Sequence, residues 1–392
     1  MTDTQIKTEL SGELTGNILP YWTSRMYDPR GGFFGRRDGN DAIVADAPKG
    51  LILNARILWT FASAYRLFRK DEYLSAATRA KEFILQRFVD PEFGGAYWSL
   101  DAEGNPLDTK KQFYAIAFAI YGLAEYNRAT GDEEALEAAI DLFHSIEDHS
   151  FDNEMDGYIE ASTRDWQPIA DMRLSDKDQN DAKTMNTHLH ILEAYTCLFR
   201  VWKDKVLEDK LRNLILIFAN VITGPDGHLQ LFFDERWQPN GRIQSFGHDI
   251  EASWLLWEAA CVLGDGAIKE RVLPICKRIA EAGMEGFTPG NGMIYEWNIS
   301  AGEKHLNRDW WVQAETVVGC WHQWRLTADD RWREAAEDAW SYIKENIIAP
   351  DGEWYWGRRA NGTVNTDDDR AGFWKCPYHN GRMCMELIEN II

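Results

Sequence analysis

Residues 71–124 contain one complete unit of the pattern that decides the fold: DEYLSAATRAKEFILQ at 71–86, GGAYWSLD at 94–101 and QFYAIAFAIYGLA at 112–124. The first segment keeps one polar face, as a helix on the outside of a protein does. The last segment is apolar nearly all round, which is typical of a buried helix. The unit therefore predicts an outer helix, a glycine turn with an aromatic-rich extended stretch, and an inner helix.

The glycine-aromatic signal recurs six times along the chain, at intervals of about 60 to 70 residues, which indicates a repeat architecture. The shared glycines are Gly32, Gly95, Gly157, Gly227, Gly292 and Gly352. Amphipathic stretches predict helices in six pairs, at 5–25, 50–69, 71–89, 108–130, 133–147, 184–202, 205–222, 245–264, 266–283, 308–327, 329–347 and 376–391. Asp132 and Asp329 stand where helix N-caps are expected.

Six helical hairpins either stack as an open solenoid or close into a ring. An open solenoid needs polar capping repeats at its ends, but the last repeat, from Trp354 to His379, is as aromatic as the middle ones. We therefore expect an all-α fold, an (α/α)6 barrel of six inner and six outer helices with short glycine-aromatic hairpins at its cleft end. Because no linker rich in Pro, Ser and Gly divides the chain, we expect residues 1–392 to form a single domain.

The charge of the chain limits its partners. Of 392 residues, 63 are acidic and 42 basic, a formal net charge of −21. An acidic surface argues against nucleic acid or an anionic membrane as the partner. No apolar run approaches the roughly 18 to 20 residues of a membrane span, and MTDTQIKTELSGEL at the N-terminus lacks the features of a signal peptide. Six cysteines without a C-x-x-C pair predict buried thiols. We expect a cytoplasmic monomer.

Tryptophan is unusually common. The chain has 18 tryptophans, roughly three to four times ordinary usage. Some of them belong to the core. The flat C–H faces of sugar rings also stack on indole, so this composition favours a carbohydrate as the small-molecule partner.

A set of polar and aromatic residues recurs near the predicted starts of the inner helices. Its members are Arg56, Tyr114, Phe118, Asn186, His188, His190, His248, Glu251, Trp310, Trp311, Glu315, Trp374 and His379. Asn186 and His190 are four residues apart and share a helix face, whereas His188 points elsewhere. His248 and Glu251 are three apart, so we expect Glu251 to accept a hydrogen bond from His248 and to raise its basicity. A lone histidine of this kind is usually a core residue, but histidines at equivalent places of different repeats favour a shared function.

Several chemistries fit such a site. A metal site formed by His188, His190, His248 and Glu251 is disfavoured, because residues two apart on a helix point in different directions. Phosphate-binding and nucleophilic-serine motifs are absent from the sequence. Glu251 and Glu315 offer the two carboxylates of a glycoside hydrolase. Histidines with an arginine suit proton transfer beside a sugar carbonyl in an epimerase or an aldose–ketose isomerase. We favour proton transfer, while a hydrolase and a non-catalytic sugar binder stay open.

Five segments resemble one known family. GLILNARILWT at 50–60, MNTHLHILEAY at 185–195, GHDIEASWLL at 247–256, WWVQAE at 310–315 and FWKCPYHNGR at 373–382 are similar to the signatures of cellobiose 2-epimerases, in the N-acylglucosamine 2-epimerase superfamily. The resemblance runs in order from Gly31 to Arg382. It implies an (α/α)6 barrel that epimerises C2 of the reducing-end sugar of β-1,4-linked disaccharides such as cellobiose, mannobiose or lactose, with no cofactor or metal.

The resemblance also implies roles for individual residues. His248 and His379 would be the acid/base pair on opposite faces of a cis-enediolate, and Glu251 would orient His248. His190, Arg56 and Asn186 would hold the enediolate oxygens. Substrate-binding aromatic residues would be Tyr114, Phe118, Trp310, Trp311 and Trp374. The sequence does not decide which histidine removes the proton, which disaccharide is physiological, or how much isomerisation accompanies epimerisation.

Overall fold

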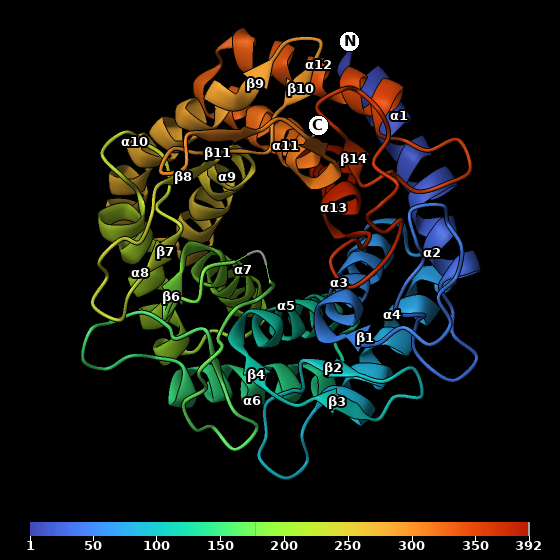
Figure 1. The fold of residues 1–392 in the computed structure, drawn as a ribbon, viewed down its shortest axis with the longest axis vertical. Helices are drawn as coiled ribbons and strands as arrows, with labels where there is room; N and C mark the ends of the chain where they lie inside the picture. Colours follow the sequence, from blue (N-terminus) through green and yellow to red (C-terminus); the bar gives the residue numbers. More distant parts are fainter. Residues whose placement is uncertain (177, 391–392) are drawn as a thin grey trace.

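The computed structural model describes residues 1–176 and 178–390, and it is mostly helical, as the sequence predicts. Six helices contact one another in closed succession around a central axis, the last returning to the first (Figure 1). These inner helices are α3 (Leu51–Phe68), α5 (Phe113–Thr130), α7 (Met185–Val201), α9 (Phe246–Leu263), α11 (Trp310–Thr327) and α13 (Tyr378–Asn390). Within the described ranges, no helix is both long and apolar enough for a membrane crossing.

A second layer of helices surrounds this ring and buries one face against it (Figure 1). The outer helices are α1 (Asp3–Glu13), α2 (Leu19–Arg25), α4 (Asp71–Phe83), α6 (Glu133–His149), α8 (Lys205–Ile217), α10 (Gly266–Gly283) and α12 (Asp330–Asn346). Short irregular helical turns continue four of them: η1 (Leu14–Ile18), η2 (Ile84–Phe88), η3 (Phe218–Ile222) and η4 (Met284–Gly286). Nearly all of α5 is buried, whereas α4 buries one stripe that includes Tyr73, Ala77 and Phe83.

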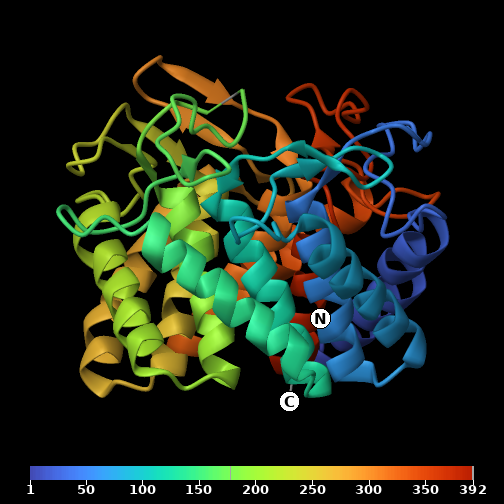
Figure 2. The ribbon, with the colours of Figure 1, turned by 90° about the horizontal axis from the view of Figure 1, so that it is seen from below.

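Short strands gather with the loops at one end of the ring (Figure 2). They are β1 (Lys49–Gly50), β2 (Ser99–Leu100), β3 (Pro106–Asp108), β4 (Lys111–Gln112), β5 (Ala161–Ser162), β6 (Lys183–Thr184), β7 (Phe232–Phe233), β8 (Ile243–Ser245), β9 (Phe287–Thr288), β10 (Gly292–Met293), β11 (Glu296–Asn298), β12 (Glu303–His305), β13 (Arg308–Asp309) and β14 (Gly357–Arg358).

The strands join each repeat to the next. The strand before an inner helix pairs antiparallel with the strand after the glycine turn of the following repeat, as β1 with β2, β4 with β5, β6 with β7, β8 with β11, and β13 with β14. An isolated bridge between Arg37 and Ala371 repeats this pairing between the last repeat and the first. These pairings hold the starts of the inner helices together at one end.

The glycine turns are tight hairpins whose geometry requires glycine. Gly95 has φ +64° and Gly157 has φ +82°, and a Cβ atom there would lie 2.5 Å and 2.3 Å from the indoles of Trp166 and Trp237. Any side chain would meet both a backbone penalty and a clash.

The helices lie close to their predicted ranges, and Asp132 and Asp329 are the N-caps of α6 and α12. Two ranges differ. The helix predicted from 108 begins at Phe113, because Lys111 and Gln112 pair with β5, and the stretch predicted at 5–25 is interrupted by the wider turn η1. Residue 391 of the last predicted range lies outside the described residues.

Candidate active site

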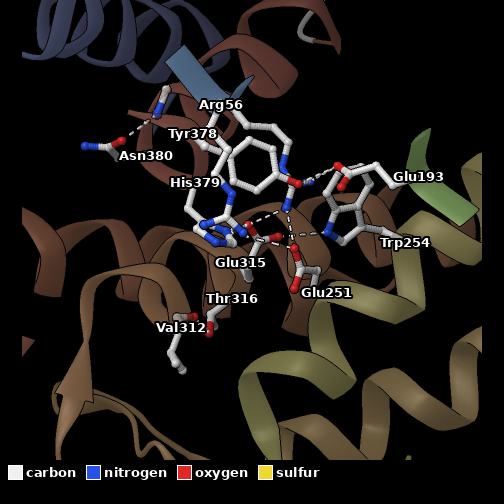
Figure 3. A network of polar contacts seen from close by, with 12 residues as sticks. Arg56, Glu193, Glu251, Trp254, Val312, Glu315, Thr316, Tyr378, His379 and Asn380 are labelled. Carbon is white, nitrogen blue, oxygen red and sulfur yellow. Dashed lines mark hydrogen bonds and ion pairs between the residues drawn. The ribbon is translucent and has the colours of Figure 1, made fainter. Parts of the chain in front are cut away.

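The residues singled out from the sequence lie near the starts of the inner helices, with Trp374 in the loop before α13. Figure 3 shows four of them, Arg56, Glu251, Glu315 and His379. Five of these helices begin directly after a paired strand, and α13 begins after a loop. All six therefore start at the end of the ring where the strands gather (Figures 1 and 2). Aromatic contacts link Tyr114 to His190, with ring centroids 5.0 Å apart, and link Trp311 to both His248 and His379. The structure therefore brings residues from six helices together.

Arg56 on α3 supplies a buried positive charge. Its Nη2 donates to the Tyr114 hydroxyl at 2.8 Å, and its guanidinium lies over the Phe118 ring at 4.1 Å. Its Nε has no hydrogen-bond partner among the described residues, and none of their carboxylates forms an ion pair with it. Because a guanidinium stays charged, Arg56 is suited to meet a developing oxyanion.

His190 on α7 is held by a carboxylate. Its Nδ1 lies 2.9 Å from Oε2 of Glu193, and its ring packs 4.6 Å from that of Phe118. Since an ionised carboxylate can only accept, Nδ1 carries the proton and Nε2 keeps a free lone pair. Burial lowers the pKa of His190, against the opposing effect of Glu193, so the ring is neutral.

His379 on α13 is held in the same way. Its Nδ1 lies 2.7 Å from Oε1 of Glu315, whose Oε2 accepts from the Trp254 indole at 3.1 Å. Burial, and next the nearby charge of Arg56, hold the pKa of His379 well below its usual range. When Glu315 is ionised it can only accept, so Nδ1 of His379 carries the proton and Nε2 is the acceptor required of a general base.

His248 on α9 has a hydroxyl partner, and the expected bond to Glu251 is wrong. Its Nδ1 lies 2.7 Å from Oγ of Ser245, one turn earlier. Glu251 instead accepts from Arg382 at 2.6 Å. Burial lowers the pKa of His248, and the nearby titratable ring of His190 lowers it further, to about 3, so the predicted rise in its basicity is also wrong.

Arg382 on α13 lies at the centre of a buried polar network, whose members Glu193, Glu251 and Glu315 are labelled in Figure 3. Its Nη2 donates at 2.6 Å to Oε1 of both Glu251 and Glu315, and its Nη1 contacts Oε1 of Glu193 and the Tyr378 hydroxyl. Tyr378 also donates to Glu193. Burial and the neighbouring Glu315 raise the pKa of Glu251 to about 8. Three carboxylates from three helices thus converge on one guanidinium.

The aromatic candidates divide into two groups. Trp311 lies against both histidines, with ring centroids 4.8 Å from His248 and 5.7 Å from His379. Its neighbour Trp310 packs mainly on Trp356, at 4.6 Å, and is 3% exposed. Trp374 is half-buried beside Tyr114, and its carbonyl faces Arg56.

The remaining candidates on α7 have different surroundings. Asn186 is half-buried, and its Oδ1 has no partner among the described residues, so it is free to accept from a hydroxyl group. His188 points away from His190, as predicted: its Nδ1 bonds to the Thr184 carbonyl and its Nε2 accepts from the Tyr158 amide. Both of its nitrogens are used, which makes it a structural residue.

One group in the described ranges has the residue types and spacing of a metal site: Glu251, Glu315 and His379, with ligand atoms within 4.8 Å of one another. It differs from the histidine set considered from the sequence. The Arg382 guanidinium already lies between the two carboxylates. A metal ion there would have to displace an arginine.

Sequence reasoning missed Glu193, Tyr378, Arg382 and Ser245. The signal for Glu193 was present, because His190 and Glu193 have the same three-residue spacing as His248 and Glu251. Arg382 lies three residues after His379 and four after Tyr378 on one helix, so its place on their face was also readable. The bond from Ser245 depends on the side-chain rotamer of His248, which spacing does not fix.

Comparisons with known proteins agree over the whole chain. The family model of N-acylglucosamine 2-epimerase (GlcNAc 2-epimerase) matches residues 32–380. The cellobiose 2-epimerase of Bacteroides fragilis is 56% identical over 389 residues, covering 98% of this chain and 99% of that protein. The cellobiose 2-epimerase of Ruminococcus albus is 40% identical, covering 97% and 98%. The solved cellobiose 2-epimerase of Bacillus thermoamylovorans has a TM-score of 0.95 at 38% identity, covering 99% and 100%.

Proposed function

Because the chain belongs to the N-acylglucosamine 2-epimerase family, as its motifs predict, and is an isomerase, we propose that it epimerises C2 of the reducing-end sugar in β-1,4-linked disaccharides. Cellobiose, mannobiose and lactose are the candidate substrates. One observation carries the proposal: His248 and His379 both pack on Trp311, and Nδ1 of His379 lies 2.7 Å from a Glu315 carboxylate oxygen, a geometry that favours a free Nε2. Full-length similarity to cellobiose 2-epimerases supports the choice of substrate.

The reaction removes one proton from C2 of the reducing-end sugar and adds one proton back to C2 on the opposite face. After the reducing-end ring opens, one histidine removes the C2 proton, and the C–H electron pair forms the C1=C2 bond of a cis-enediolate while the C1 carbonyl oxygen takes the negative charge. The other histidine donates a proton to the opposite face of C2, and the carbonyl re-forms. His379 suits removal in one direction, because its neutral ring has a free Nε2. His248 is assigned the return step: because its ring is neutral at rest, it takes up a proton from solvent before this step, and His379 releases one to solvent afterwards. The two roles exchange in the reverse direction.

The enediolate oxygens require positive or hydrogen-bonding groups. Arg56 supplies a charge with no competing carboxylate, and its Nε is unpartnered in the described structure. His190 and Arg56 both pack on the Phe118 ring. Asn186, with an unpartnered Oδ1, holds a substrate hydroxyl. Tyr114, Phe118, Trp311 and Trp374 form the aromatic surroundings of the sugar rings. Trp310, predicted as a further binding residue, packs on Trp356 and supports the fold of the site instead.

The proposal extends to the whole protein. The closed succession of inner helices inside an outer layer supports an (α/α)6 barrel that forms one domain, residues 1–392. The protein works as a cytoplasmic monomer without a cofactor or metal. Its six cysteines are free thiols, five of them buried and Cys261 exposed, which suits a reducing compartment.

A glycoside hydrolase is the second candidate, and the arrangement of carboxylates disfavours it. Hydrolysis needs two carboxyl groups on either side of the scissile bond. Glu251 and Glu315 instead accept from the same nitrogen of Arg382 and are both buried, and Glu315 is also bonded to His379. Neither is placed to approach a glycosidic oxygen.

One incubation separates the candidates. Cellobiose is incubated with the protein in D2O and followed by NMR. We expect deuterium at C2 and a mannose-type reducing end. Release of free glucose would identify a hydrolase, a ketose product would identify an aldose–ketose isomerase, and saturable binding without any new signal would identify a sugar-binding protein.

A further inference from the structure

Arg382 is one of the largest fully buried side chains, and it touches carboxylates from three inner helices. Glu193 comes from α7, Glu251 from α9 and Glu315 from α11, while Arg382 itself is on α13. The guanidinium also lies over the rings of Trp254 and Tyr378, at 4.7 Å and 4.2 Å. Four of the six inner helices are therefore joined through one side chain.

Such a cluster is costly to bury unless its geometry is good. Isolated carboxylates lose several kcal/mol of hydration each on burial, and only close, well-oriented partners offset that loss. The planar guanidinium supplies several donors in fixed directions. Two of the carboxylates that it holds are the Nδ1 partners of His190 and His379.

The two carboxylates meet Arg382 and their histidines in different ways. Glu193 accepts from Arg382 and Tyr378 on Oε1 and from His190 on Oε2. Glu315 accepts from Arg382 and His379 on Oε1 and from Trp254 on Oε2. In Glu193, Arg382 fixes one oxygen and the other oxygen holds His190, whereas in Glu315 Arg382 and His379 share Oε1. In both cases a carboxylate held by Arg382 sets the direction of an imidazole ring.

We propose that Arg382 is a positioning residue that orients His190 and His379 together, by fixing the two carboxylates that hold their Nδ1 atoms. The inference deepens the function proposed above and rests on it for the roles of the histidines. Arg382 touches no substrate in this scheme: it is fully buried behind the carboxylates. Through the two carboxylates, it orients both the proposed oxyanion-binding residue His190 and the proposed acid/base residue His379.

A second consequence is electrostatic. Arg382 is a fixed positive charge beside both rings, so it disfavours their protonated forms. The other charged or titratable groups that act on His379 are Arg56 on α3, His190 and Glu193 on α7, Glu251 on α9, Glu315 on α11 and its neighbour Tyr378 on α13. His248 on α9 packs on the same Trp311 ring. Tyr114 on α5 and Cys376, which precedes α13, both contact Arg56. Removing Arg382 therefore removes a charge that disfavours the imidazolium form, while Glu193 and Glu315, the direct partners of the two rings, remain to favour it.

The test uses Arg382→Met, Arg382→Lys and a matched control, Arg66→Met. Arg66 is also a partly buried arginine that bridges carboxylates of neighbouring inner helices, Glu125 at 2.7 Å and Glu389 at 3.1 Å, but it lies in the last turn of α3. For each variant, kcat and KM for cellobiose are measured against pH, together with thermal unfolding. The 15N signals of the histidine rings, assigned with His190→Gln and His379→Gln, report which ring nitrogen carries the proton.

We expect the wild type to show Nδ1–H tautomers for His190 and His379. Arg382→Met should lower kcat by about 10- to 100-fold with less than about a threefold change in KM, and should move the acidic limb of the pH profile to higher pH. Arg382→Lys keeps the charge but cannot span three carboxylates, so kcat should fall while the limb stays near its wild-type position. Arg66→Met should lower stability alone.

Several results would overturn the inference. Ring 15N signals that show Nε2–H tautomers for His190 and His379 in the wild type would overturn it. This result needs no variant, so it holds even if Arg382→Met fails to fold. Unchanged ring signals and an unchanged pH profile in a folded Arg382→Met would reduce Arg382 to a structural role. The ring signals do not depend on turnover. If cellobiose is not epimerised but the predicted tautomers are present and are lost in Arg382→Met, the proposed function fails while the positioning role stands.

Discussion

At the scale of single residues, His248 and His379 differ in the group that holds Nδ1, a hydroxyl for one and a carboxylate for the other. General acid/base groups typically contribute 10²- to 10⁴-fold each. We expect His248→Gln and His379→Gln each to lose at least about 100-fold in kcat while thermal unfolding stays close to that of the wild type. The control is His144→Gln, an exposed histidine on α6, which should keep both properties. A variant that retains more than about a tenth of kcat would remove that histidine from proton transfer.

The partners of these histidines give a second prediction. Ser245→Ala should change the ring 15N signals of His248 and lower kcat by about 3- to 10-fold, the value of one hydrogen bond, and Ser245→Thr should restore part of the rate. Glu251→Gln should instead change the signals of His379, because Glu251 lies 3.9 Å from its Nδ1 and shares Arg382 with Glu315. Movement of the His248 signals in Glu251→Gln would contradict this assignment.

The tryptophan pair gives a third prediction. Trp311 contacts both histidines, whereas Trp310 packs on Trp356 and lies beneath the Lys375 ammonium. Trp311→Ala should therefore raise KM for cellobiose by about 5- to 30-fold, the loss of roughly 1–2 kcal/mol of stacking, and should lower kcat. Trp310→Ala should mainly lower the midpoint of thermal unfolding. Equal kinetic losses in both variants would show that the two rings are not divided in this way.

Sequence spacing predicted which residues meet, but not all of the hydrogen bonds between them. The same rule, a carboxylate three residues after a histidine, holds at His190–Glu193 and fails at His248–Glu251. The difference lies one turn earlier. Ser245 is available to His248, whereas the equivalent Thr187 donates to Glu160 at 2.6 Å. Which of two nearby groups bonds to a histidine depends on side-chain rotamers and on the hydrogen bonds that those groups already make. Sequence spacing carries no information about either.

At the scale of elements, three of the glycine turns are each held to the following inner helix by an ion pair with a buried lysine. Lys49, Lys111 and Lys183 precede α3, α5 and α7, and each reaches back 2.8 Å to an aspartate of the preceding turn, respectively Asp28, Asp90 and Asp152. The helices and turns were predictable from periodicity and glycine. The two-residue strands were not, because each is too short to show alternation and exists through its pairing with the next repeat.

The start of α7 gives a pH-dependent prediction. Glu160 is buried and accepts from the Thr184 amide, the Thr184 hydroxyl and the Thr187 hydroxyl, and burial raises its pKa to about 8. The folded state therefore holds a proton that the unfolded state releases near its ordinary pKa. Stability from this group is present at acid pH and is lost as the pH rises from about 4.5 to about 8.

Glu160→Gln cannot titrate, so it removes this loss. Its cost in unfolding free energy relative to the wild type should be largest near pH 5 and should shrink by an amount on the order of a few kcal/mol by pH 8. Urea unfolding of both proteins at the two pH values measures the difference. A cost that is constant or grows with pH would show that Glu160 is already ionised in the folded state.

At the scale of the whole molecule, the ring closes through both ends of the chain. The repeats predicted the helix pairs, and the aromatic last repeat predicted a closed ring. The contacts that close the ring, however, link residues more than 300 positions apart in the sequence. The Trp354 indole donates to Glu13 at 2.7 Å, and the Trp22 indole donates to Glu353 at 2.6 Å. No local pattern could pair these residues.

Glu353 tests the closure most directly. It is fully buried and accepts from Trp22 of α2, from Lys375 at 2.9 Å and from Asn380 of α13 at 2.6 Å. Glu353→Ala leaves the Lys375 ammonium buried without its partner, a loss of roughly 3–5 kcal/mol. Glu9→Ala is the control, because Glu9 also joins the N-terminal helix to the last repeat, through Trp340 and Lys344, but at the surface, where such pairs contribute about 0–1 kcal/mol.

The expected result follows from the position of His379 beside Asn380 on α13. In a closed ring this helix cannot loosen alone, since it packs on both α3 and α11. Urea should therefore abolish far-UV helicity and epimerase activity at the same midpoint in the wild type, and Glu353→Ala should lower both midpoints together. An open stack of repeats would behave differently, with the end repeats unfolding first. Activity lost well before helicity, in the wild type or in Glu353→Ala, would mean that the ends of the chain come apart while the other repeats stay folded.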